Sequence, residues 1–290
     1  MITGARVRRL LLEDGRCRGV EYTGAGGTRT VLADRETVLA AGTIGSPHLL
    51  MLSGIGPADH LRDIGVEVVA DLPGVGANLH DHVTGYVVHE AAQRVPGGPS
   101  AEAQVLTRSA EGVAPDLLLL FAGAALRPRW TGADPGGYSI LFSLMDPYSR
   151  GTLRLRSADP TVSPLIDPAY LSDDRDLDRL VVGLRLAREL GGTEALAQWR
   201  TAESAPGVDV QDDEACRAYL RSTASTSFHP VGTCRIGTDE LAVVDPELRV
   251  RSVEGLRVAD ASVMPSVVSA PTNATVLAVA ERAAHFMTGF

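Results

Sequence analysis

The N-terminal part of the sequence alternates short apolar runs with turn-forming residues. Residues 5–40 contain several β-rich runs, separated by the dipeptide Asp14-Gly15 and by the glycine cluster 24–27. Turns between β-rich runs of this length predict a hairpin or meander. Residues 36–42 then form a mostly apolar run that ends in glycine, which favours a buried strand of a parallel sheet.

Two helices and a strand are predicted next. Ser46 can cap a helix through its hydroxyl, and Pro47 has the fixed φ angle that suits the first helical position. The pattern therefore predicts a helix over 47–54. A second, short helix is predicted over 57–63 and a strand over 66–72.

The middle of the sequence has a different pattern. Apolar residues at helical spacing predict a helix over 173–190. The polar stretch 93–100, rich in glycine and proline, indicates an exposed loop. Strands are predicted at 85–90, 116–122, 138–145 and 151–156. We expect this block to be an antiparallel sheet with helices on one face, the α+β arrangement.

The C-terminal part returns to a strand followed by a helix. Residues 255–260 predict the strand and residues 271–287 the helix, with Thr272 or Asn273 as its cap. Because strand–helix pairs occur at both ends with a different block between them, we predict a discontinuous domain that holds an insertion.

Composition and charge argue against two kinds of partner. The 290 residues are 44% hydrophobic and 22% charged, which is typical of a globular protein. Nucleic acid is not an expected partner, because phosphate binding needs a basic surface and the net charge is −9. No apolar run approaches the roughly 18 residues of a membrane span.

The cysteines indicate a cellular compartment. Cys17, Cys216 and Cys234 lie far apart and form no CxxC pair. They fit neither a disulfide framework nor a zinc site, so a reducing compartment is favoured and the cytoplasm is the predicted location.

Three stretches could carry chemistry, and each also has a purely structural explanation. They are residues 40–57, 228–237 and 256–284. Clustered glycines serve turns and helix ends. A histidine before proline, such as His229, is more often structural than catalytic, and Asn273 at a helix start is in most proteins only a cap.

Taken together, these stretches resemble the glucose–methanol–choline (GMC) oxidoreductase family. AGTIGSPHLLMLSGIG resembles the second signature of the family, and HPVGTCRIG resembles its catalytic-histidine segment. DASVMP followed by PTNAT resembles the end of the flavin-binding domain and the helix with the second catalytic position. PGVGANLHDH at 73–82 matches the stretch after the second signature. The motifs occur in family order, and the resemblance covers essentially the whole chain.

The resemblance implies an FAD-dependent oxidoreductase acting on the CH–OH group of donors. A small-molecule alcohol, the expected partner, would become an aldehyde or ketone by proton abstraction and hydride transfer to flavin N5. The implied fold class is α/β plus α+β. It consists of a partial, discontinuous Rossmann-like FAD-binding domain over 1–84 and 225–290, with an inserted antiparallel-sheet substrate-binding domain over 85–224.

The same resemblance implies roles for site residues. His229 matches the histidine that takes the hydroxyl proton or positions the alkoxide. Asn273 matches a position that the family fills with His or Asn; an amide cannot be a base, so it would hydrogen-bond the substrate oxygen. The helix that begins at Asn273 would face the anionic reduced flavin. Residues implied to contact FAD are Ala41, Gly42, Asp260, Ala261, Asn273 and Thr275.

The sequence departs from the family in two respects. It has no GxGxxG turn for the FAD pyrophosphate, only fragments at 24–29 and 74–79, and it lacks the family's first signature. We therefore expect the C-terminal portion of a family member, with the FAD-binding segment upstream or on a separate polypeptide. The alternative function is a truncated member that cannot bind FAD alone and has no autonomous activity.

A metal-dependent hydrolase is the competing class of protein. His80, Asp81, His82 and His89 include an HxH pair, and such pairs bind metals. The family resemblance explains the same segment as a structural turn near the cofactor, with Asn78 and Asp81 bonded to backbone, so no metal site is expected. A serine hydrolase is disfavoured because the sequence has no GxSxG elbow.

The sequence leaves the substrate open. Choline would need a carboxylate and an aromatic box around its trimethylammonium group, for which Trp130, Tyr138 and Phe142 are candidate aromatics. Aliphatic or aromatic primary alcohols are the broader class. Both an oxidase and a dehydrogenase remain open, because that choice depends on oxygen access to the flavin.

Overall fold

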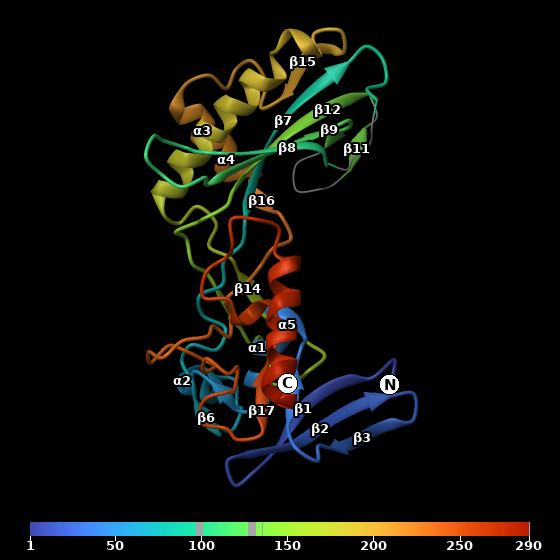
Figure 1. Ribbon diagram of the computed structural model, residues 1–290, viewed down its shortest axis with the longest axis vertical. Coiled ribbons are helices and arrows are strands. Elements are labelled where there is room, and N and C mark those ends of the chain that lie inside the picture. Colours follow the sequence, from blue (N-terminus) through green and yellow to red (C-terminus); the bar gives the residue numbers. More distant parts are fainter. Residues whose placement is uncertain (97–100, 127–131, 135, 290) are drawn as a thin grey trace.

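The chain forms two lobes along the long axis of the molecule (Figure 1). The computed structural model describes residues 1–96, 101–126, 132–134 and 136–289. In the view of Figure 1 the lower lobe contains both ends of the sequence and also β14 (Leu165–Asp167), and the upper lobe contains most of the middle of the sequence.

A three-stranded antiparallel sheet begins the lower lobe. Its strands are β1 (Arg6–Glu13), β2 (Arg16–Gly24) and β3 (Gly27–Leu32), in that order. The turn between β1 and β2 lies at Asp14 and Gly15, which have φ angles of 49° and 75°. Positive φ at both central residues suits a tight hairpin turn. The predicted meander is confirmed.

A parallel pair of strands joins the two ends of the sequence. β4 (Thr37–Leu39) pairs with β17 (Leu256–Val258). Helix α1 (Gly42–Leu52) follows β4, and the 3-10 helix η3 (Ala261–Val263) follows β17. Parallel pairing places the carboxyl ends of both strands at one edge, so the segments that follow them become neighbours.

Helix α1 begins earlier than the sequence predicts. Ser46 and Pro47 are both inside the helix instead of at its start. Pro47 has no N–H for the carbonyl of Thr43, four residues earlier. That carbonyl accepts a hydrogen bond from the Thr233 hydroxyl instead, at 2.6 Å. A tertiary contact thus replaces the missing helical bond, which sequence spacing could not show.

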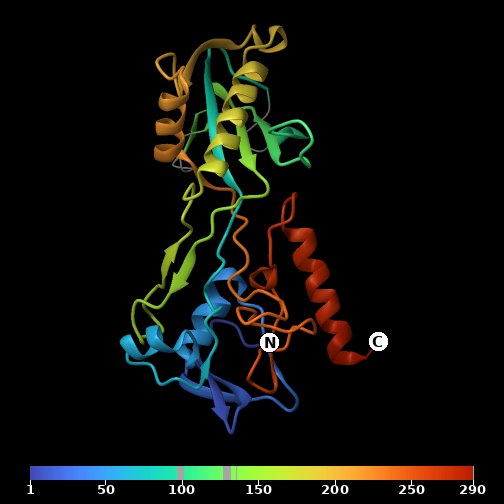
Figure 2. The same ribbon diagram turned by 90° about the vertical axis from the view of Figure 1, so that its left-hand side faces the viewer.

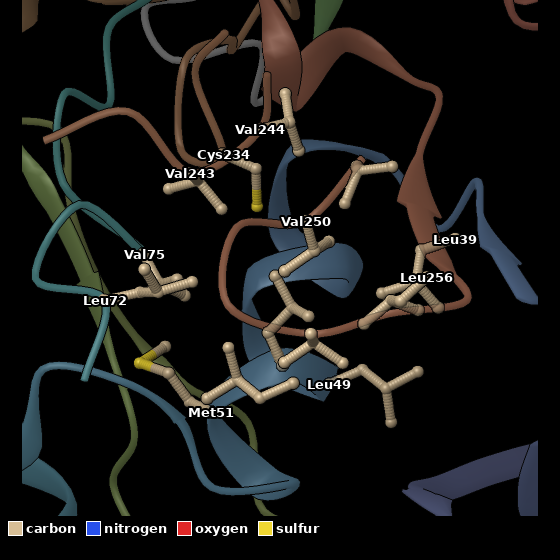
Figure 3. Packing of buried hydrophobic residues seen from close by; sticks show 14 of the residues in the cluster. Leu39, Leu49, Met51, Leu72, Val75, Cys234, Val243, Val244, Val250 and Leu256 are labelled. Atoms are coloured by element: carbon tan, nitrogen blue, oxygen red, sulfur yellow. The ribbon is translucent and has the colours of Figure 1, made fainter. Parts of the chain in front are cut away.

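One cluster of buried apolar side chains holds the lower lobe together (Figure 3). Leu39 from β4, Leu49 from α1 and Leu256 from β17 meet there. Val243 and Val250 come from the loops before β17. Each buried aliphatic side chain contributes about 1.5–3 kcal/mol. The two ends of the sequence therefore share one core.

The upper lobe is a six-stranded antiparallel sheet with helices on one face (Figures 1 and 2). The strand order is β15-β7-β12-β9-β8, and β16 also pairs with β7. Apolar side chains of α3 pack against alternate residues of the sheet, such as Ile140 and Phe142. The predicted antiparallel block is confirmed for the strands over 85–90, 116–122 and 138–145. The strand predicted over 151–156 lies outside this sheet, because it pairs with residues 165–167 and its Leu153 packs in the core of the lower lobe. The elements of the upper lobe are β7 (Val83–Ala91), β8 (Ala101–Thr107), β9 (Leu117–Ala122), β12 (Gly137–Leu144), β15 (Arg200–Ala205), β16 (Ser225–Thr226), α3 (Asp174–Gly191) and α4 (Asp213–Thr223).

The remaining elements are short, apart from the last helix. The predicted strand over 66–72 is reduced to two residues, and the predicted loop over 93–100 is described only as far as residue 96. None of the helices in the described part of the chain is long and apolar enough to cross a membrane. These elements are β5 (Ile55–Gly56), α2 (Ala58–Asp63), β6 (Ala70–Asp71), β10 (Ala125–Leu126), β11 (Ala133–Asp134), β13 (Thr152–Arg154), β14 (Leu165–Asp167), η2 (Glu194–Leu196) and α5 (Asn273–Thr288).

Candidate active site

His229 lies where the upper sheet meets the lower lobe. The chain leaves β16, which pairs with the start of β7, and then runs antiparallel to the residues before β7. Ser227 N donates to His82 O at 3.0 Å, and His80 and Val231 exchange two backbone hydrogen bonds of 3.2 and 2.9 Å. This ladder brings His229 beside His82, although 147 residues separate them in sequence.

The buried carboxylate of Asp81 holds the His229 segment in place. One of its oxygens accepts the His229 backbone N–H at 2.9 Å. The other accepts the Tyr170 hydroxyl at 2.6 Å and the Thr226 hydroxyl. Donors therefore satisfy both oxygens of this carboxylate, which is 3% exposed. The expectation that Asp81 bonds backbone is confirmed.

His82 and His229 form a hydrogen-bonded histidine pair. Their Nδ1 atoms are 2.9 Å apart, and the rings are nearly perpendicular, at 85°. His82 is fully buried, and burial, helped by the nearby His229, lowers its pKa to about 4. Burial also lowers the pKa of His229, and the carboxylate of Asp81 partly opposes that shift. At neutral pH the pair is therefore uncharged and His229 can accept a proton.

The ring nitrogens of the HxH pair are already occupied. His80 Nδ1 lies 2.6 Å from the Asn78 carbonyl, and its Nε2 accepts the Val267 N–H at 2.9 Å. His82 is bonded at both nitrogens as well. Among the described residues, no group of three His, Cys, Asp or Glu side chains could hold a metal ion. The hydrolase hypothesis therefore gains no ligand set from this segment.

Thr43 ties the start of α1 to the His229 segment. Its hydroxyl donates to the carbonyl of Pro230 at 2.7 Å, while its own carbonyl accepts from Thr233. Because Pro230 follows His229 directly, these bonds fix the backbone on the second side of the histidine. Asp81 fixes the first side, so the imidazole is attached to a backbone that is restrained at both ends.

Asp260 links the ends of the two parallel strands. One carboxylate oxygen accepts the Gly42 N–H at 3.0 Å and the Ser46 hydroxyl at 2.6 Å. The other accepts the Ser262 N–H at 2.8 Å. Ser46, expected as a helix cap, thus binds Asp260 instead. The bonded and 5% exposed carboxylate of Asp260 organises the backbone around Gly42 and Ala261.

Helix α5 begins close to the His229 segment. Val276, in the first turn of α5, packs with Val231, Met264 and Val267 in one apolar cluster. The expected side-chain cap is wrong, because Thr272 is the capping residue and its side chain makes no cap hydrogen bond. The backbone turns into the helix through Thr272 itself, with φ −73° and ψ −17°. The first N–H groups of α5 consequently have no acceptor in the described part of the chain.

An open groove of about 710 Å³ lies along β4 and α1. Ala41, Gly45 and His48 line it, and the buried Nε2 of His48 has no hydrogen-bond partner among the described residues. Small side chains beside an unpaired polar atom suit a flat, partly polar group such as the adenine half of a dinucleotide. His229 is not among the residues that line this groove.

The two segments that meet at His229 both match models of known protein families. Two family models, both described as GMC oxidoreductase, match residues 1–84 and 147–280. The chain belongs to the GMC oxidoreductase family. The family expected from the motifs is confirmed, and the first matched segment contains His82 while the second contains His229 and Asn273.

Relatives of this GMC oxidoreductase chain include enzymes that act on choline. Choline oxidase of Arthrobacter globiformis is 42% identical over 302 residues, which cover 99% of this chain and 55% of that protein. The mitochondrial choline dehydrogenase of Homo sapiens is 38% identical over 312 residues, which cover 98% of this chain and 52% of that protein. The chain thus spans about half the length of these curated relatives.

Solved structures show the same fold. Pyridoxine 4-oxidase from Mesorbium loti superimposes with a TM-score of 0.91 at 37% identity, over 99% of this chain and 57% of the other. A formate oxidase of Aspergillus oryzae RIB40, in a study of FAD modification, gives a TM-score of 0.88 at 27% identity, over 98% of this chain and 60% of the other. The α/β fold of GMC oxidoreductases is therefore shared.

The structure joins some of the expected site residues directly and leaves others separate. Asp260 binds the backbone of Gly42, and Ala261 packs in the apolar cluster that contains Val231. Asn273 and Thr275 lie in the first turn of α5 and are not buried. His82 is the site residue that motif analysis assigned to a turn. Its only signal in the sequence is that it is the last residue of the motif HDH at 80–82, directly before an apolar strand.

Proposed function

We propose that this chain carries the proton-accepting part of an FAD-dependent alcohol oxidoreductase acting on CH–OH groups. The observation that supports this proposal is how His229 is held. Its backbone N–H is bonded to the buried Asp81, and its Nδ1 is bonded to the neutral His82. Its Nε2 makes no hydrogen bond to any described residue. His229 is therefore proposed to take the hydroxyl proton at Nε2, and FAD, when bound, accepts the hydride at N5.

Asp81 supports the charge that His229 would acquire. When Nε2 takes a proton, the ring becomes a cation close to the ionised carboxylate of Asp81. Opposite charge nearby favours the charged form. Asn273 is proposed to hold the alcohol oxygen through its amide, because it is exposed at the start of α5, and the first turn of this helix packs in one cluster with Val231, two residues after His229.

Three features of the lower lobe support FAD as the cofactor. The ends of β4 and β17 are linked through Asp260, and an open groove with an unpaired His48 nitrogen lies beside Ala41. The backbone N–H of Ala261 and the first N–H groups of α5 have no acceptor among the described residues. Unpaired N–H groups at a helix start bind anions, which suits the phosphate and the reduced ring of a flavin. We accordingly propose 1–84 and 225–290 as the FAD-binding domain and 85–224 as the substrate-binding domain.

We further propose that a polypeptide segment with a glycine-rich pyrophosphate-binding turn completes the flavin site. Helix α5 supports this, since Ala283 is its one buried residue among those described and Leu277 is 60% exposed. A helix with apolar residues on most sides is usually buried. The relatives, which are nearly twice as long, have the additional chain length for such a segment.

The substrate proposed is a small alcohol. Two of the aromatic residues considered for a choline box are unsuitable, because Tyr138 and Phe142 are buried in the face of the upper sheet that α3 covers. Tyr138 stacks on His89, and Phe142 contacts the helix at Gly183. Trp130 lies outside the described residues. A small primary alcohol therefore stays the broader proposal, and choline is to be tested beside a primary alcohol without a cationic group.

The cytoplasm is proposed as the location. Cys17, Cys216 and Cys234 are all free and buried, which suits a reducing compartment.

Flavin retention tests the proposed function. The 290-residue chain and the same chain joined to the part of Arthrobacter globiformis choline oxidase that it does not cover are incubated with FAD and desalted, and visible absorbance is measured. We expect flavin at about one per chain only in the joined protein, with bleaching on adding an alcohol. If the chain alone retained as much FAD as the joined protein, the proposed segment would not be needed. If neither protein retained FAD, the FAD proposal would be overturned.

A further inference from the structure

His82 has a hydrogen-bond partner on each ring nitrogen. Its Nε2 lies 3.0 Å from the Val268 carbonyl oxygen, and its Nδ1 lies 2.9 Å from Nδ1 of His229. The ring is fully buried, and with a pKa of about 4 it is neutral at pH 7 and carries one proton. The nitrogen that carries this proton decides which nitrogen of His229 can act as a base.

The carbonyl of Val268 places the proton of His82. A carbonyl oxygen only accepts, so the 3.0 Å contact is a hydrogen bond only if His82 Nε2 is protonated. The Met145 carbonyl also lies near the ring. A proton on Nδ1 instead would leave the Nε2 lone pair against the Val268 oxygen, which is repulsive. Nδ1 of His82 is therefore an acceptor.

We propose that His82 is a positioning residue that holds His229 as the tautomer with the proton on Nδ1 and the lone pair on Nε2. Two neutral ring nitrogens 2.9 Å apart share one proton, and Nδ1 of His82 has none to give. His229 must supply it, so its Nε2 is the nitrogen with the free lone pair. The catalytic meaning of this arrangement rests on the proposed function, whereas the tautomer itself does not.

The surrounding charged groups do not set this tautomer. Asp81 bonds the His229 backbone and two hydroxyls, and it makes no hydrogen bond to the His229 ring. His80, the other histidine near His82, is bonded at both ring nitrogens to different partners. An isolated neutral imidazole of histidine prefers its proton on Nε2, which would block the base. His82 reverses that preference.

The tautomer of His229 can be read in the flavin-free 290-residue protein from long-range proton–nitrogen NMR correlations of its ring. We expect the proton on Nδ1 in the wild type. His82→Phe keeps a ring but has no acceptor, so the proton is expected to move to Nε2. His82→Asn offers Oδ1 near the position of Nδ1, so it is expected to restore the wild-type tautomer.

Two results would overturn the proposal. One is a wild-type His229 protonated on Nε2, which decides the matter even if His82→Phe does not fold. The other is the same tautomer in the wild type and in folded His82→Phe. His285, on the exposed side of α5, serves as the control ring and is expected to give one pattern in all three proteins. Because no flavin is present, failure of FAD binding leaves this measurement unaffected.

Discussion

A few buried side chains around His229 determine what the site can do. Asp81 is bonded on both oxygens, and both rings of the histidine pair are neutral at pH 7, so the site has one carboxylate and one free imidazole nitrogen. This arrangement resembles a base whose orientation is fixed by a third group. Residues that orient the ring are thus as important as the ring itself.

His229→Ala is expected to lower alcohol turnover of the flavin-loaded protein by about 10²–10⁴-fold, the contribution of a positioned general base. FAD retention should be unchanged, because the groove at Ala41 and the Asp260 linkage do not involve the imidazole. Asn273→Ala is the comparison variant and should lose less. Steady-state turnover and the flavin content of each variant are measured. Turnover near the wild-type value in His229→Ala would remove this residue from the mechanism.

At the scale of elements, the site depends on the junction of β4, β17, α1 and η3. Asp260 holds the starts of α1 and η3 together, and Thr43 and Thr233 connect α1 to the His229 segment. The residue implied to contact the cofactor is therefore also a structural one. Its two roles can be separated in the flavin-free chain, where only the structural role is present.

Asp260→Asn is expected to lower the free energy of unfolding of the flavin-free chain by about 1–3 kcal/mol. The amide NH₂ of Asn is a hydrogen-bond donor, so it would face another donor, either the Gly42 N–H, the Ser46 hydroxyl or the Ser262 N–H, and a hydrogen bond would be lost. Ser46→Ala, which removes one of the three bonds to Asp260, should cost less. Urea unfolding measures both variants. An unchanged midpoint for Asp260→Asn would mean that the carboxylate serves the cofactor alone.

At the scale of the whole molecule, the two lobes are joined where the buried histidines lie. The pKa values of His80 and His82 are both about 4 in the folded chain, mainly because burial disfavours the charged ring. The unfolded chain has ordinary histidines of pKa 6.5. Between these values the unfolded state binds more protons, so acid pulls the equilibrium toward unfolding.

The free energy of unfolding is therefore expected to be highest above about pH 6.5 and to fall as the pH decreases toward 4. Each of the two histidines contributes at most about 1.4 kcal/mol per pH unit in this window. Urea unfolding at half-unit pH intervals measures the slope. His82→Asn should reduce the slope, since it removes one of the two histidines whose pKa falls to about 4. A flat profile in the wild type would contradict the prediction.

Local sequence determined those features that depend on neighbouring residues. Asp14-Gly15 specifies a tight turn, apolar periodicity specifies α3 and the strands of the upper sheet, and the order of the motifs identifies the family. Helix α1 and the start of α5 were predicted less well. Ser46 and Thr272 have cap-forming side chains, but Ser46 bonds to Asp260 and the Thr272 side chain makes no cap bond.

Tertiary structure alone decided how distant residues combine. Spacing along the chain carries no information about which groups a β-ladder brings together, and His82 meets His229 across 147 residues. Asp81 likewise gathers donors from two distant segments, Tyr170 at 89 residues along the chain and the segment of Thr226 and His229 at 145 and 148 residues. The sequence thus determined the family and the candidate base. Burial and hydrogen-bond geometry, which exist only in the folded chain, decided the protonation and orientation of that base.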